Sequence, residues 1–88
     1  MTDTAQAMRE RLQRLEPENV EVFDESAQHA GHAGAAGGGG HYRLVIVAQQ
    51  FAGLNAVARH RLVYQTLGDL MHGRVHALAI TALTPEEL

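Results

Sequence analysis

The sequence contains no cysteine and no tryptophan, and all seven of its basic residues are arginine. Without cysteine the chain cannot form a disulfide, offer a thiol nucleophile or bind an iron–sulfur cluster through its own thiolates. No apolar run approaches the roughly 20 residues that span a bilayer, and Met1 to Glu10 hold no apolar signal-peptide core. These absences predict a cytoplasmic protein without membrane segments. The net charge of −3 gives no overall attraction to nucleic acid.

A chain of 88 residues can build one modest hydrophobic core, so we expect a single domain over residues 1–88. Glycine gathers in the segment 25–40, which ends in four successive glycines and also carries His29 and His32. A connection of this length and composition is expected to be flexible, and to be a functional or disordered loop rather than a simple link.

Apolar spacing divides the rest of the chain into helices and strands. A helical face recurs over residues 3–16 and again from Arg59 to Met71, where Gly73 is expected to end the helix. Further elements are expected as strands at 20–23, 41–48 and 75–83, a short helix at 54–58 and a capped turn at 84–87. The last strand is apolar or small at both parities, which is typical of a strand covered on both sides.

This order of elements, αββααβ with a short C-terminal helical turn, predicts an α+β fold. A three-stranded mixed sheet with the helices packed on one face would cover every apolar stripe. The sequence shows no nucleophile set beside a base, no phosphate-binding loop and no paired carboxylates next to a histidine. The chain is therefore interpreted as a non-enzyme.

Histidines are the residues most suggestive of function. His76 stands at the start of the last strand, where it could be a metal ligand. From the residue alone, a structural histidine hydrogen-bonded to a backbone carbonyl is the simpler interpretation. His29 and His32, three residues apart, could bind a divalent metal ion weakly or be solvated loop residues. His41 and His72 are expected to be exposed.

A second group, Arg59, His60 and Arg61, stands near the start of the main helix. These residues could form an ordinary solvated turn. Alternatively, they could contact an acidic partner surface or a phosphate group.

The sequence carries a set of short motifs: Phe51-x-Gly53, Arg59-His60-Arg61-Leu62-Val63-Tyr64, Val75-His76-Ala77-Leu78-Ala79-Ile80 and Thr84-Pro85, with Asp24-Glu25-Ser26 and His41-Tyr42 upstream. In combination they resemble the BolA family, and the resemblance covers Met8 to Glu87. It implies a fold like a class II KH domain. It also implies that the partner is a monothiol glutaredoxin, with which the family shares a bridging [2Fe-2S] cluster.

The resemblance further implies which residues bind that cluster. His76 and one loop histidine, His29 or His32, would be ligands, with His29 fitting the family position better, while the glutaredoxin and its glutathione supply thiolates. The implied role is iron–sulfur cluster trafficking or iron-status regulation, by a protein that alone is a monomer or weak homodimer. A DNA-binding transcriptional regulator is the alternative. However, the GxxG loop with which a KH domain binds nucleic acid is missing, because Gly53-Leu54-Asn55-Ala56 stands at its position.

Overall fold

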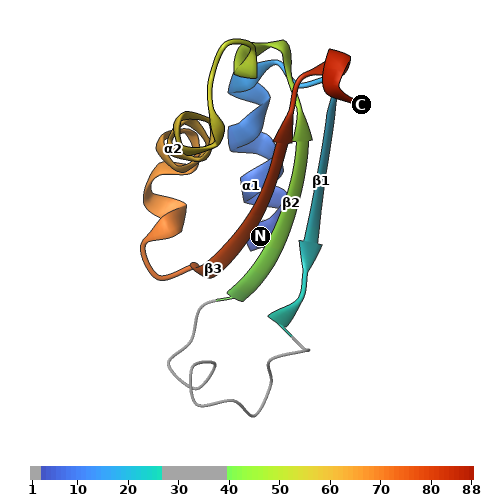
Figure 1. Cartoon of the computed structure of the whole chain (residues 1–88). Coiled ribbons are helices and arrows are strands. Elements are labelled where there is room, and N and C mark those ends of the chain that lie inside the picture. The colour runs from blue at the N-terminus through green and yellow to red at the C-terminus, as the bar shows by residue number, and fades with distance from the viewer. Residues whose placement is uncertain (1–2, 27–39) are drawn as a thin grey trace.

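The computed structural model describes residues 3–26 and 40–88. Two helices, α1 (Thr4–Leu12) and α2 (Ala56–Leu67), pack against one face of a sheet formed by β1 (Asn19–Asp24), β2 (Gly40–Val47) and β3 (Val75–Leu83) (Figure 1). The central strand β2 is antiparallel to β1 and parallel to β3. The predicted α+β fold, with a three-stranded mixed sheet and helices on one face, is therefore confirmed.

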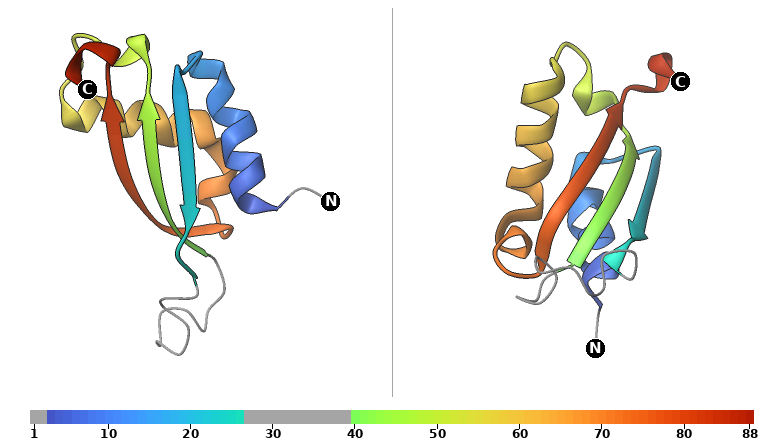
Figure 2. Two further views of the ribbon diagram at one scale, coloured as in Figure 1. Left: turned by 90° about the vertical axis from the view of Figure 1, so that its right-hand side faces the viewer. Right: turned by 60° about the horizontal axis from the view of Figure 1, so that its bottom comes forward.

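The core lies between the helices and the sheet. Alternate residues of β2 point into it, as the period of two along a strand requires. These residues are Tyr42, Leu44 and Ile46. The helices contribute fully buried apolar residues to the core. The short 3-10 helix Gln49–Phe51 contributes Phe51, which is also fully buried. Among the described residues no helix covers the other face of the sheet (Figure 2).

The expectation that β3 is covered on both sides is wrong. His76, Ala77 and Ala79 are exposed, whereas Leu78 and Ile80 pack against the core. Alanine counts as apolar in a sequence pattern, but its small side chain can face water at little cost. β3 is thus an edge strand of the sheet with one face toward solvent.

The two consecutive helices expected before β3 are one α-helix. The side chain of Asn55 caps α2 by accepting a hydrogen bond from the amide of Ala58 at 2.9 Å. The helix ends at Gly68 rather than at Gly73, because Gly68 has a φ of 57°, a left-handed value that favours glycine. The 3-10 helix Gly68–Met71 follows and continues the apolar face of α2 into the core.

Candidate functional site

Three strand ends meet at one end of the sheet: β1 ends there, and β2 and β3 begin there (Figure 1). His29 and His32 lie outside the described residues, but Ser26 and Gly40, which flank that segment, are both at this end. The hydroxyl of Ser26 accepts a hydrogen bond from the amide of His41 at 3.1 Å, and the amide of Glu25 donates to the carbonyl of His41 at 2.8 Å. These bonds fix the chain where the segment begins and ends.

His76 is exposed at this end of the sheet, as the second residue of β3. Gly40 pairs with Val75 and His41 pairs with Ala77, so β3 uses one residue more than β2 over this interval. His76 is that extra residue, and it therefore lies in a β-bulge. Bulges commonly redirect a side chain near a functional site. The imidazole is not buried in the core, so it can be reached from outside.

The ring of His41 lies beside that of His76. Their centroids are 5.2 Å apart, and the ring planes are tilted by 40°. His41 is half-buried, so the expectation that it is exposed is wrong, whereas His72 is exposed as expected. The sequence held one signal for this pairing: both histidines stand at the start of a strand. Only the parallel pairing of those two strands brings the rings together.

The open face of the sheet next to these histidines carries charge and aromatic surface. The guanidinium of Arg43 lies 4.9 Å from the centroid of the Phe23 ring, and its Nε lies 3.2 Å from a carboxylate oxygen of Glu25. A depression of about 270 Å³ on this side is bordered by both Glu25 and His41. A partner that approaches His76 would meet this mixed surface.

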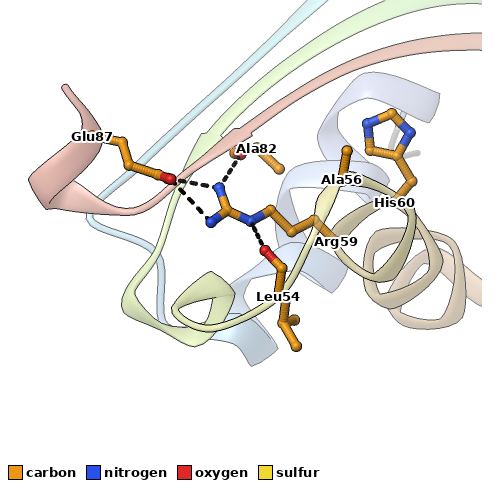
Figure 3. Close-up of a pocket in the computed structure, with 6 residues that line it drawn as sticks. All are labelled: Leu54, Ala56, Arg59, His60, Ala82 and Glu87. Carbon is orange, nitrogen blue, oxygen red and sulfur yellow. Dashed lines mark hydrogen bonds and ion pairs between the residues drawn. The ribbon is translucent and has the colours of Figure 1, made fainter.

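The side chain of Arg59 makes its contacts within the protein. Its guanidinium donates hydrogen bonds to the carbonyls of Leu54 (2.8 Å) and Ala82 (3.0 Å) and to both carboxylate oxygens of Glu87 (2.6 and 3.1 Å) (Figure 3). The side chain is only 13 % exposed. Contact of Arg59 with a partner protein stays a prediction. The contacts within the protein already give this arginine a structural role.

Glu87 is correspondingly tied to the fold. Hydrogen bonds from Arg59 and from the backbone amide of Thr84 lower the pKa of its carboxyl to about 2. Thr84 and Glu87 form the capping box expected for the C-terminal turn, the 3-10 helix Pro85–Glu87. The ion pair thus fastens the C-terminal turn to the start of α2.

The other two residues of the predicted contact group are not part of this ion pair. His60 borders a pocket of about 320 Å³ together with Arg59 and Glu87, and its ring points away from the ion pair (Figure 3). Arg61 is exposed on α2. Arg61 is therefore the better placed of the two arginines to meet a partner.

Within residues 3–26 and 40–88, no group of three or more His, Cys, Asp or Glu residues could hold a metal ion. Within the same residues, no helix has the length and apolar character needed to cross a membrane.

The fold and the exposed strand-end histidine define a small α+β protein with a KH-like sheet. The sequence profile of the family described as "BolA-like protein" matches residues 12–87. The chain is 46 % identical over 87 residues to protein BOLA1, chloroplastic, of Arabidopsis thaliana, with 94 % of this chain and 54 % of that protein covered. It is 43 % identical over 73 residues to the DNA-binding transcriptional regulator BolA of Vibrio cholerae, with 83 % and 66 % covered.

Among solved structures, the chain resembles the BolA domain of SufE1 from Arabidopsis thaliana. The TM-score is 0.85 at 41 % identity, and the match covers 100 % of this chain and 99 % of that one. The chain therefore belongs to the BolA family, which is non-enzymatic. It spans about half the length of the curated BOLA1 relative that it matches.

Proposed function

We propose that this protein is a cytoplasmic partner of a monothiol glutaredoxin and shares a bridging [2Fe-2S] cluster with it. The observation that carries the proposal is the exposed imidazole of His76 in the bulge at the start of β3. A cluster held between two proteins requires a ligand that a visiting protein can reach. A ring buried in the core would have ruled this out.

The donor chemistry of the chain fits that role. The sequence has six histidines and no cysteine, so an iron atom bound by this chain alone could receive imidazole but not thiolate. His76, with His29 or His32 from the segment outside the described residues, would ligate one iron, and the glutaredoxin with its glutathione would supply sulfur. Imidazole in place of thiolate makes a [2Fe-2S] cluster less negative and raises its reduction potential. The physiological task would be cluster trafficking or iron-status regulation.

Contacts within the chain position the two histidines at this end of the sheet. The bulge turns His76 outward. The backbone of His41 is held beside it, because its amide donates to Ser26 and its carbonyl accepts from Glu25. Ligation requires the neutral imidazole, so binding should weaken in acid.

Mixing the protein with a glutathione-loaded, cluster-bearing glutaredoxin tests the proposal. Wild-type protein should change the visible absorption and circular dichroism of the cluster, and the His76→Gln variant should leave the glutaredoxin-only spectrum. His72→Gln is the matched control, because His72 is also exposed and precedes β3. Parallel His29→Gln and His32→Gln variants identify the loop ligand. A wild-type spectrum in His76→Gln would remove the ligand assignment.

DNA binding is a second candidate, because the Vibrio cholerae relative is named as a DNA-binding regulator. Arg61 is exposed, but Arg59 is paired with Glu87, and the net charge is −3. If DNA is bound through phosphate contacts, the affinity should fall steeply with salt and fall further in Arg61→Ala. Binding that is unchanged in Arg61→Ala would exclude this surface.

A further inference from the structure

A further pocket lies between α1, the 3-10 helix Gly68–Met71 and the residue that precedes β3. Its volume is about 320 Å³, which is within the range of small-molecule sites. Three of the seven arginines of the chain border it, namely Arg11, Arg14 and Arg74. The remaining borders are Ala7, Glu10 and Leu70. We call this site the arginine pocket.

Two of these arginines are held in place by hydrogen bonds within the chain. One terminal nitrogen of Arg11 donates to the carbonyl of Leu67 at 2.8 Å and to a carboxylate oxygen of Asp69 at 2.6 Å. The Nε of Arg74 donates to the hydroxyl of Thr4 at 3.2 Å. Because these bonds already orient the two guanidinium groups, a ligand would lose less entropy in ordering them.

The charge of the arginine pocket favours an anion. Three arginines border it and only one carboxylate, that of Glu10, whereas the chain as a whole carries a net charge of −3. Asp69 neutralises Arg11 in part, but Arg14 is exposed and has no ion pair within residues 3–26 and 40–88. Cations near the end of a helix such as α1 also stabilise that helix. That effect does not account for Arg74, which comes from a different segment.

The arginines are spread along α1 rather than gathered at one point. Ala7 and Arg14 both border the pocket and are about 10 Å apart along the helix axis. Arg74 is tied to Thr4 at the start of α1, whereas Arg14 follows the end of that helix. One phosphate group would meet only part of this row, whereas linked phosphate groups would meet all of it. Guanidinium groups bind phosphate oxygens through paired, charge-assisted hydrogen bonds.

We propose that the arginine pocket binds a compound with two or more linked phosphate groups, either a nucleoside triphosphate or an inorganic polyphosphate. Arg14 and Arg74 would bind the two ends of the phosphate chain, and Arg11 its middle. The small side chain of Ala7 leaves room for that chain, and the buried Leu70 forms the floor. Binding needs neither a glutaredoxin nor a cluster, so the proposal is independent of the proposed function.

The test is a titration of the protein alone with inorganic triphosphate, in the absence of divalent metal ions. It is followed by the ¹H–¹⁵N NMR signals of the backbone and of the arginine Nε–H groups. Signals of α1, Leu70 and Arg74 should shift and saturate, and inorganic phosphate should bind at least about tenfold more weakly. A parallel titration with ATP distinguishes the two sources. Affinity at least equal to that of triphosphate indicates a nucleotide, and weaker affinity indicates an inorganic chain.

Four variants locate the site. Arg14→Gln and Arg74→Gln should each weaken triphosphate binding about three- to tenfold, because each removes a charge-assisted contact. Glu10→Gln should strengthen it about two- to threefold, because it removes a repelling charge. Arg43→Gln is the matched control: it removes the same charge from an exposed arginine on the open face of the sheet, so it should bind like wild type.

Three results would overturn the proposal. One is the absence of NMR shifts at about 10 mM triphosphate. Another is equal affinity for phosphate and triphosphate. The last is equal weakening by Arg43→Gln and Arg14→Gln, which would show a general attraction between charges. Circular dichroism checks the folding of each variant, and the gain expected in Glu10→Gln cannot arise from misfolding. Failure of the glutaredoxin experiment would leave these shifts unchanged, so the two proposals can fail separately.

Discussion

The start of β2 is a position where a single methyl group should have a measurable effect. A Cβ added to Gly40 would overlap the ring of Tyr42, lying 2.6 Å from its hydroxyl oxygen and 2.7 Å from Cζ. Comfortable contacts between carbon atoms are about 3.5–4.0 Å, so the ring would have to move by about 1 Å. Tyr42 is only 8 % exposed, and its ring belongs to the core. It cannot swing away without disturbing its neighbours.

Two opposing terms decide the stability of Gly40→Ala. Overpacking a filled core costs about 1–3 kcal/mol. Replacing glycine by alanine at an allowed backbone position stabilises by about 0.4–1 kcal/mol through the unfolded chain, and Gly40 does not have a positive φ. We expect the steric term to win, giving a net loss of about 1–2 kcal/mol. The melting temperature should fall by about 4–8 °C for each kcal/mol.

A double-mutant cycle isolates the contact with Tyr42. Urea and thermal denaturation, followed by circular dichroism, are measured for Gly40→Ala in wild type and in a Tyr42→Leu background. Without the ring, only the unfolded-state term remains, and Gly40→Ala should become neutral or stabilise by up to about 1 kcal/mol. Equal destabilisation in both backgrounds would refute the reasoning, because the cost would then not come from the ring.

Three further predictions concern the rest of the fold. Because the folded pKa of Glu87 is about 2, below its ordinary 4.5, the stability from its pairing with Arg59 is present above 4.5 and lost as pH falls toward 2. When stability is measured as a function of pH in acid, Glu87→Gln should therefore lose less stability over this window than wild type. Phe51→Ala should cost about 3–5 kcal/mol in urea denaturation, because the ring is fully buried, whereas the exposed Val57→Ala should stay within about 0.5 kcal/mol. Asn55→Ala should cost about 1 kcal/mol by loss of the α2 cap, and Asn55→Asp should retain most of that stability in the same denaturation assay.

The sequence by itself determined the local elements and the place of His76 along the chain. The period of two at Tyr42, Leu44 and Ile46 and the capping box at Thr84 and Glu87 are local signals, because each depends on residues a few positions apart. The resemblance on which the family prediction rested came from other motifs, chiefly those at 59–64 and 75–80.

Only the tertiary structure decided which distant groups meet. The rings of His41 and His76 lie 5.2 Å apart because β2 and β3 pair in parallel with a bulge, and no local propensity encodes that register. Arg59 appeared free for a partner in the sequence, but the fold brings Glu87 and two backbone carbonyls to its guanidinium. In both cases the chemistry depends on contacts between segments far apart along the chain, and packing of the whole domain determines those contacts.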